Sequence, residues 1–254
     1  MSDPRYARSF DSVAELYEQA RPEYAEAAVD WFVELLGLRP GDRVLDLGAG
    51  TGKLTRQLVR RGLEAVAVEP GDEMRAVLQR VLPGVEALAG TAEEIPVPDA
   101  SVDAVTCGQA FHWFEREAAL GEMARVLRPG GGIALLWNAW DADDPLLGAI
   151  DGLLRPHRPP HVGEDSLVDT WQAGVFGPLR ELRTRQARRM TGEQLVGWAA
   201  STSGFVNAGR DEQERIAAEI RRLAGAGESS VSIRTDALAA QLTRGSSGMR
   251  ATSS

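Results

Sequence analysis

Between residues 43 and 137 the chain alternates short apolar runs with longer stretches in which apolar residues recur every three or four positions. The apolar runs predict strands at residues 43–47, 65–69, 85–89, 101–108 and 133–137. The amphipathic stretches predict helices at residues 53–60, 72–81 and 115–127. Strands and helices that alternate at this spacing form right-handed crossovers. We therefore expect an α/β fold with a doubly wound, mainly parallel sheet and helices on both faces.

The first forty residues lack this alternation. A helix over residues 10–20 is predicted by apolar side chains at helical spacing, namely Phe10, Val13, Leu16, Tyr17 and Ala20. Pro22 suits the first turn of a second helix that runs to Leu36, and Gly37 suits its C-terminal end. We interpret residues 1–40 as an N-terminal helical cover or lid, residues 41–140 being the α/β core.

Beyond Asn138 the alternation weakens. Helices are predicted at residues 146–154, 191–200 and 211–223, the second opened by a capping box of Thr191 and Gln194. Residues 179–190 and 230–235 predict outer strands, and residues 155–164 predict an irregular insertion. We expect residues 141–236 to complete the same domain. Residues 237–254, which end in a Ser- and Gly-rich stretch, are expected to form a flexible tail.

A glycine-rich turn, Asp46-Leu-Gly-Ala-Gly-Thr-Gly52, follows the first predicted strand. Glycine permits tight turns and lets a ligand approach the backbone, so this turn predicts a nucleotide-type pocket at the carboxyl end of that strand. Its spacing is G-x-G-x-G. A dinucleotide fingerprint would need a glycine where Lys53 stands. A phosphate-binding P-loop would need glycine at Leu47 and serine or threonine at Leu54.

An acidic residue, Glu69, ends the second apolar run, 21 residues beyond Gly48. A carboxylate at the end of a second parallel strand can accept hydrogen bonds from both hydroxyls of a ribose. The loop and Glu69 together therefore predict a site for a ribose-containing cofactor.

At this point the chain resembles the class I S-adenosylmethionine-dependent methyltransferases. Three further segments add to the glycine loop and Glu69. Residues 90–96 are similar to the family's segment after its third strand, and residues 109–114 to its exit from the fourth strand. Residues 118–131 are similar to the helix and turn that lead into its fifth strand. The resemblance covers residues 41–137 and is greatest to methyltransferase type 11-like enzymes, in the small-molecule branch with the trans-aconitate methyltransferase-like proteins. It implies a Rossmann-like, seven-stranded sheet whose last strand is antiparallel.

The resemblance also implies which residues bind the cofactor S-adenosyl-L-methionine, with S-adenosyl-L-homocysteine as the product of the reaction. The loop would hold the amino-acid end and sugar, the second-strand acid the ribose, and the segment after the third strand the adenine. The residues so implied are Asp46, Gly48, Ala49, Gly50, Gly52, Glu69, Pro70, Met74, Ala92, Glu93, Gln109 and Ala110.

The acceptor is expected to meet the methyl group where the fourth strand ends. Phe111 and Trp113 are candidates for cation–π contact with a sulfonium, worth on the order of 0.5–2 kcal/mol, or for simple packing. His112 is a candidate base for a hydroxyl acceptor, or a residue that only shapes the site. The resemblance adds three lid candidates over the cofactor, Tyr17, Arg21 and Tyr24.

Composition and net charge argue against some classes of binding partner for this protein. A net charge of −9 over 254 residues argues against nucleic acid, and no apolar run of membrane-spanning length occurs. The N-terminus has no apolar signal segment, so we expect a cytoplasmic protein, a monomer or homodimer, acting on a small-molecule acceptor. The single cysteine excludes an internal disulfide, and His157 and His161 lack neighbouring ligands for a metal.

Three functions remain open. The first is methyl transfer to a small molecule. The second is a nicotinamide-dependent oxidoreductase, disfavoured because Lys53 is the sole lysine and no Tyr-x-x-x-Lys pair exists. The third is a non-catalytic domain that only binds the cofactor. The basic stretch at residues 180–189 suits either an anionic acceptor or a solvated edge strand.

Overall fold

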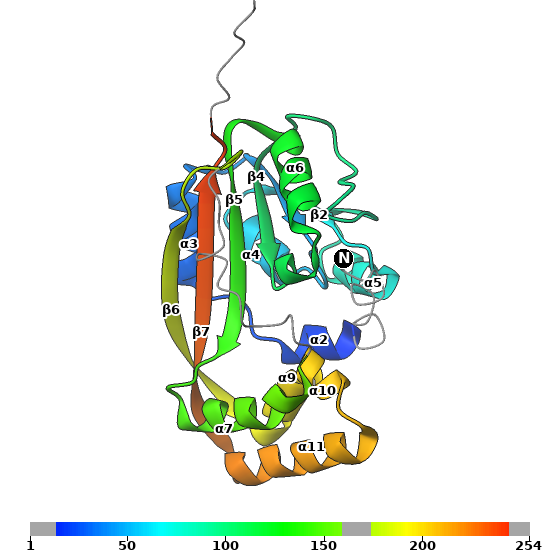
Figure 1. The fold of residues 1–254 in the computed structure, drawn as a ribbon, viewed down its shortest axis with the longest axis vertical. Coiled ribbons are helices and arrows are strands. Elements are labelled where there is room, and N and C mark those ends of the chain that lie inside the picture. The colour runs from blue at the N-terminus through cyan, green and yellow to red at the C-terminus, as the bar shows by residue number, and fades with distance from the viewer. Residues whose placement is uncertain (1–13, 159–173, 244–254) are drawn as a thin grey trace, which may run out of the picture.

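The computed structural model of the chain describes residues 14–158 and 174–243. A single seven-stranded sheet in the order β3-β2-β1-β4-β5-β7-β6 runs through it (Figure 1). β7 is antiparallel to both of its neighbours, and the other strands are parallel to one another. The predicted fold class is therefore confirmed. The strands are β1 (Arg43–Leu47), β2 (Glu64–Val68), β3 (Glu86–Leu88), β4 (Val102–Gly108), β5 (Leu127–Trp140), β6 (Arg180–Thr191) and β7 (Glu228–Gln241).

Helices cover both faces of the parallel part of the sheet. One face packs against α6 (Arg116–Val126), and the other against α3 (Glu26–Leu35) and α4 (Lys53–Arg60). In β1, Val44 belongs to the second of these cores, whereas Leu45 and Leu47 belong to the first. Because both faces are buried, a central parallel strand is apolar almost throughout, which is why the short runs were visible in the sequence.

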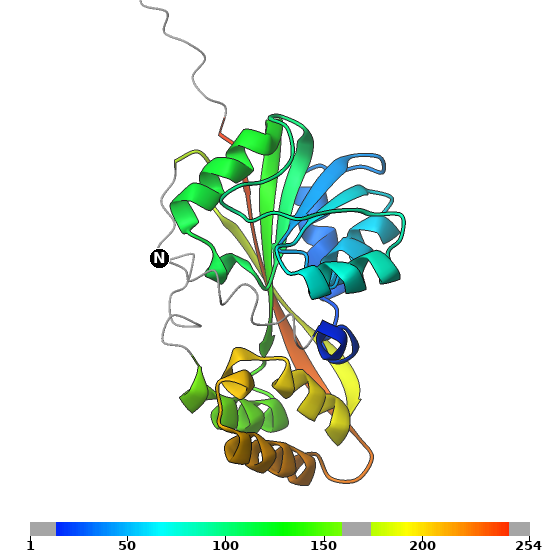
Figure 2. The same ribbon diagram turned by 90° about the vertical axis from the view of Figure 1, so that its right-hand side faces the viewer.

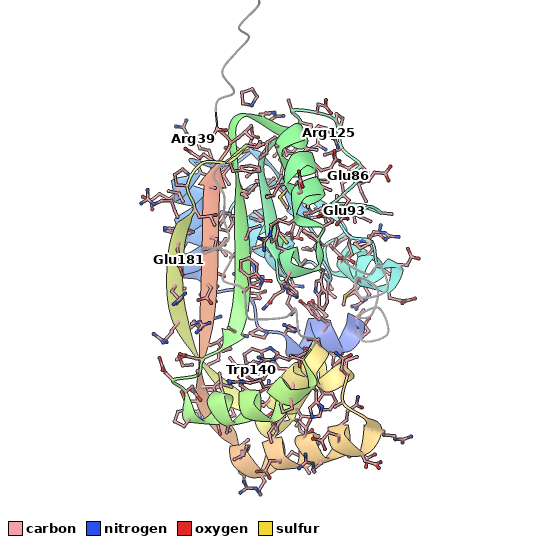
Figure 3. All side chains as sticks on the ribbon, viewed as in Figure 1. Arg39, Glu86, Glu93, Arg125, Trp140 and Glu181 are labelled. Atoms are coloured by element: carbon pink, nitrogen blue, oxygen red, sulfur yellow. The ribbon has the colours of Figure 1, made fainter. Side chains whose placement is uncertain are left out.

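The three strands β5, β6 and β7 extend past the others and carry a second helical layer, drawn at the lower end of Figures 1 and 2. Its helices pack around an apolar cluster of their own, beside Trp140 (labelled in Figure 3). Trp140 stacks on Trp198 with ring centroids 3.8 Å apart. The helices are α7 (Pro145–Leu154), α9 (Gly192–Ala200), α10 (Ser203–Val206) and α11 (Arg210–Ala224). The predicted capping box at Thr191 is confirmed at the start of α9.

The helix α2 (Ala14–Ala20) lies between the α/β part and this helical layer (Figure 2). On one side Ala14 and Tyr17 pack against Met74 of α5 (Asp72–Val81). On the other side Leu16 and Ala20 lie against α9 at Gly197. The helix thus contacts both parts of the molecule and lies next to the carboxyl ends of the parallel strands (Figure 1).

Two predicted boundaries near the ends of elements are wrong. Pro22 does not begin the second helix, since α3 starts at Glu26. The carbonyl oxygens of Pro22 and Glu23 instead accept hydrogen bonds from Asn138, and residues 22–25 are not helical. Strand five was predicted to begin at residue 133, but β5 begins at Leu127 and reaches its normal register with β4 after an irregularity.

The predicted tail also begins too early. Residues 237–241 belong to β7, and Ala237, Ala239 and Ala240 are buried. β7 lies inside the sheet, between β5 and β6, and both of its faces are covered there: Ala237 and Ala239 pack in the core with α3 and α4, and Ala240 packs in the core with α6. The predictions for residues 10–13, 159–164 and 244–254 fall outside the described residues.

Candidate functional site

The glycine loop turns sharply between β1 and α4. Gly48, Gly50 and Gly52 have φ of +67°, +56° and +86°, a left-handed conformation that other residues rarely adopt. A Cβ at Gly48 would lie 2.6 Å from the Cβ of Ala110, so the loop packs directly on the segment that follows β4. At Gly50 no atom of the described residues lies within 4 Å of such a Cβ, so within this part of the chain that side of the loop is open.

The carboxylate of Glu69 lies beside the glycine loop, at Gly50. Glu69 directly follows β2 and is buried. Its Oε2 accepts the N–H of Gly50 and its Oε1 accepts the N–H of Gly71, each at 2.8 Å. These two backbone donors therefore fix the orientation of the carboxylate at the glycine loop.

The side chain of Asp46 lies beneath the loop and is 1% exposed. It accepts hydrogen bonds from the hydroxyls of Thr55 at 2.6 Å and Thr106 at 3.2 Å. Burial raises the pKa of Asp46 to about 6, even though both hydroxyls favour the charged form. Near neutral pH the chain thus keeps a largely ionised carboxylate under the glycine loop.

The exit of β4 is held in an unusual backbone conformation. Gln109 has φ +60°, its N–H donates to Leu136, and its side-chain Nε2 donates to the carbonyl oxygen of Asn138 at 2.6 Å. A left-handed conformation at a residue other than glycine persists only where the surroundings impose it, and such residues concentrate at functional sites.

The aromatic residues that follow are placed differently from one another. Phe111 is buried in the core and meets Phe114 edge to face, with ring centroids 5.8 Å apart. His112 lies beside Trp113, with centroids 4.6 Å apart, and its Nδ1 accepts the indole N–H of Trp137 at 3.4 Å. Of these candidates, His112 and Trp113 are half-buried and Phe111 is a core residue.

The predicted adenine-side residues are spread over several elements. Met74 is buried against α2, Ala92 is buried in the main core, and Pro70 is half-buried directly after Glu69. Glu93 is exposed, and its Oε1 accepts the N–H of Glu115 at 2.8 Å, where α6 begins (Figure 3). The carboxylate of Glu93 is therefore already engaged in the structure at one of its oxygens.

The three lid candidates converge on this region from α2 and the connector that follows it. Burial raises the pKa of Tyr17. The positive charge of Arg21 lowers this pKa, and the negative charge of Glu69 raises it further. The guanidinium of Arg21 lies 4.9 Å from the ring centroid of Tyr17 and donates to the hydroxyl and carbonyl oxygens of Ser201. Tyr24 is buried with its hydroxyl against Gly108.

A residue that the sequence did not reveal, Glu18, fastens α2 to the loop. Its carboxylate accepts the hydroxyl of Thr51 at 2.7 Å and the guanidinium of Arg56 at 2.6 Å. Lys53 donates to its backbone carbonyl at 2.6 Å. Burial by itself would raise the pKa of Glu18, but Arg56, Thr51 and Lys53 outweigh it, and the pKa is lowered overall.

Replacing Glu18 with glutamine is expected to loosen α2. Loss of the charge-assisted bonds to Arg56 and Thr51 should speed amide exchange of residues 14–21 by about tenfold. Because the pKa of Glu18 is lowered, its contribution is present above the ordinary value of 4.5 and is lost as the pH falls through the lower folded value. Hydrogen exchange at pH 7 measures the effect.

The matched control for that experiment is Glu15→Gln on the same helix. Glu15 is exposed and pairs only at the surface with Arg80. Equal exchange in both variants would show that the contacts of Glu18 do not hold the helix down.

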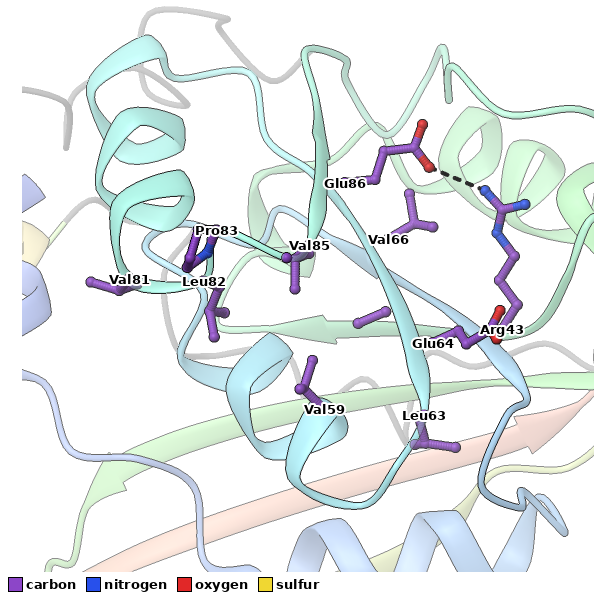
Figure 4. A pocket seen from close by; sticks show the side chains of 12 residues that line it. Arg43, Val59, Leu63, Glu64, Val66, Val81, Leu82, Pro83, Val85 and Glu86 are labelled. Atoms are coloured by element: carbon purple, nitrogen blue, oxygen red, sulfur yellow. Dashed lines mark hydrogen bonds and ion pairs between the residues drawn. The ribbon is translucent and has the colours of Figure 1, made fainter.

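A surface groove of about 490 Å³ lies away from these residues (Figure 4). It is lined by Val59, Val81 and the ion pair between Arg43 and Glu86, at the amino ends of the strands. Open α/β sheets bind ligands at the carboxyl ends of their strands, so this groove is not the candidate site.

Neither a metal centre nor a membrane span is found in the part of the chain that the structure describes. Among those residues, no three His, Cys, Asp or Glu side chains are grouped to hold a metal ion. His157 pairs with Glu212 at 3.3 Å, and His161 lies outside the described ranges. No helix within the described residues is long and apolar enough to cross a bilayer.

Known methyltransferases are similar to this chain in sequence. Residues 45–135 match the family model described as a methyltransferase domain. An uncharacterized methyltransferase-like protein of Schizosaccharomyces pombe is 35% identical over 211 residues, or 82% of each chain. Uncharacterized methyltransferases of Mycobacterium bovis and Mycobacterium tuberculosis are 54% identical over 133 residues, 52% of this chain and 53% of theirs. The chain thus spans about half the length of these mycobacterial relatives in the match.

A solved structure of another methyltransferase superposes on this chain. The putative type II methyltransferase from Anaeromyxobacter dehalogenans superposes with a TM-score of 0.64 at 26% identity, over 87% of this chain and 97% of that one. The sheet order, the glycine loop and these likenesses define a class I methyltransferase architecture. The chain belongs to the class I methyltransferase family, as its sequence motifs predicted.

Proposed function

We propose that the protein transfers a methyl group from S-adenosylmethionine to a small-molecule acceptor. The observation that carries this proposal is the carboxylate of Glu69, oriented by the N–H groups of Gly50 and Gly71 beside the open side of the loop. Each oxygen of a carboxylate carries two lone pairs, so a ribose hydroxyl can be accepted beside a backbone N–H. Membership of the methyltransferase family supports this cofactor over a nicotinamide dinucleotide, as does the G-x-G-x-G spacing.

The residues present fit this donor, which supplies a methyl group on a positively charged sulfur. Glu69 would hold the ribose, and the backbone of residues 48–52 would hold the amino-acid end. The buried carboxylate of Asp46 lies under the loop, where negative charge favours a cationic ligand. Met74 and Ala92 would contribute apolar surface to the adenine side.

The chain's own contribution to the reaction is alignment and the exclusion of water. A sulfonium is already an excellent leaving group, so an in-line displacement depends mainly on how acceptor and methyl are placed. The helix α2 lies over the loop and is tied on one side through Glu18 and on the other through Arg21. These ties suit α2 to the task of covering the donor.

The contacts of His112 bear on whether it serves as a base. Its Nδ1 accepts the indole N–H of Trp137, so the neutral imidazole carries its proton on Nε2. In that tautomer Nε2 cannot accept a further proton, and Nδ1, the nitrogen that could, is engaged by Trp137. We therefore propose that His112 orients an acceptor oxygen or nitrogen, in preference to the base role.

Calorimetric titration with S-adenosylhomocysteine, beside NADH, tests the proposed cofactor. We expect micromolar-range affinity for S-adenosylhomocysteine and none for NADH. Binding of NADH alone would contradict the proposal. Turnover of S-adenosylmethionine with a panel of small hydroxyl, amine and carboxylate compounds then distinguishes an enzyme from a domain that only binds the cofactor.

A further inference from the structure

The side chain of Asn138, near the carboxyl end of β5, is fully engaged with distant parts of the chain. Its Nδ2 donates to the carbonyl oxygens of Pro22 at 3.1 Å and Glu23 at 3.2 Å. Its Oδ1 accepts the hydroxyl of Thr235 at 2.6 Å. An amide is the short side chain that offers two donors and an acceptor together, which is what these partners require.

The backbone of the same residue holds the exit of β4. The carbonyl oxygen of Asn138 accepts the side-chain Nε2 of Gln109 at 2.6 Å, and Gln109 is the residue with φ +60°. That conformation is unfavourable at a residue other than glycine, so it depends on such restraints. Asn138 therefore contacts the segment where the acceptor is expected to lie.

Residues 21–25 connect α2 to α3 and are held mainly by side chains. The N–H of Tyr24 donates to Oε1 of Gln57, and the N–H of Ala25 donates to the hydroxyl oxygen of Thr235, each at 3.2 Å. Thr235 is fully buried and also bonds to Asn138, with which it is paired in the sheet. The connector, β7 and the exit of β4 thus meet at Asn138.

We propose that Asn138 is a positioning residue that couples closure of α2 over the cofactor to the conformation of the acceptor-side exit at Gln109. The inference rests on the function proposed above, because it assigns cofactor and acceptor to the two sides that Asn138 joins. Movement of the connector at Pro22 and Glu23 pulls on the amide group, and the same residue carries the carbonyl that restrains Gln109.

The experiment compares Asn138→Asp with the wild-type full-length chain. Aspartate has the same size, but it presents oxygens to the carbonyls of Pro22 and Glu23 and loses both donors. We expect affinity for S-adenosylhomocysteine to fall about tenfold, the size of effect expected from the loss of two hydrogen bonds at this half-buried side chain. Amide exchange should rise about tenfold in two separate peptides, one covering residues 18–28 and one covering residues 106–114.

Asn207→Asp is the matched control, since Asn207 is the other asparagine of the chain and is exposed in the helical layer. It should leave affinity and both peptides unchanged. Thr235→Val serves as a second variant. It keeps both donors of Asn138 and removes the donor to its Oδ1 together with the acceptor of the Ala25 N–H, so residues 18–28 should exchange faster and residues 106–114 should change less than in Asn138→Asp.

The outcomes separate the inference from the proposed function. If the wild-type protein does not bind S-adenosylhomocysteine, the proposed function fails. If the wild type binds and Asn138→Asp binds equally, with both peptides unchanged, the positioning role fails. A change confined to residues 18–28 would overturn the coupling, as would faster exchange spread evenly over the whole chain, which would mark general destabilisation.

Discussion

Replacing Glu69 with alanine is expected to weaken binding of S-adenosylhomocysteine by roughly 100-fold to 10,000-fold. Two hydrogen bonds from ribose hydroxyls to a charged group would be lost, each contributing roughly 1.5–3 kcal/mol. The N–H groups of Gly50 and Gly71 would lose their acceptor as well, so the loop would no longer be fixed at its open side. Isothermal titration of the folded variant measures the loss.

Two further variants make the result specific. Glu64→Ala removes an exposed glutamate from the opposite end of β2 and should bind as the wild type does. Glu69→Gln keeps the size of the side chain but turns an amide N–H toward one of two backbone donors, so we expect it to bind nearly as weakly as Glu69→Ala. Wild-type affinity in a folded Glu69→Ala variant would rule out the ribose assignment.

The central part of the fold could be predicted because its signals are local. β1, α4 and α5 begin and end at the predicted residues, since a strand buried on both faces is apolar throughout and the helices between strands are amphipathic. The glycine loop was equally visible. Its positive φ angles leave glycine as the residue with least strain at those positions.

The outer part could not be predicted because its burial depends on pairing between distant segments. Residues 237–240 contain only small and apolar side chains, and their sequence does not show that β5 and β6 lie on either side. On β6, Arg183 pairs with Asp236 and Arg185 with Asp141. These pairs favour the solvated edge strand over a site for an anionic acceptor.

The contacts that hold α2 could not be predicted from the sequence either, because they join residues that lie far apart in the chain. Glu18 meets Thr51 and Arg56 across 33 and 38 residues, and Asn138 meets Pro22 across 116. No periodic pattern relates positions so far apart. Lys53, the sole lysine, stands directly after the loop, yet only the fold shows that it reaches the backbone of α2.

The buried carboxylate of Asp46 leads to the second large expected effect. Replacing Asp46 with asparagine is expected to stabilise the protein at pH 8 and to leave its stability nearly unchanged at pH 4. Burial raises the pKa of Asp46 from an ordinary 3.8 to about 6. The folded state thus binds the proton more tightly than the unfolded state, and stability falls as the pH rises from about 4 to about 6.

Above pH 6 that loss is complete and amounts to roughly 3 kcal/mol, since each pKa unit corresponds to about 1.4 kcal/mol. Asparagine carries no charge, and its amide can pair with the hydroxyls of Thr55 and Thr106. Urea unfolding at pH 4 and pH 8 measures the difference. Asp30→Asn, at an exposed ion pair on α3, is the control and should show no such pH dependence.

The expected cost of a buried carboxylate at neutral pH fits a side chain whose charge is used for a ligand. The donor proposed here carries positive charge on its sulfur and on its amino group, and a buried negative charge beneath the glycine loop attracts both. The variant Asp46→Asn should therefore be more stable at pH 8 and bind S-adenosylmethionine more weakly. A variant that gains stability and binds S-adenosylmethionine with unchanged affinity would show that the charge of Asp46 is not used for the donor.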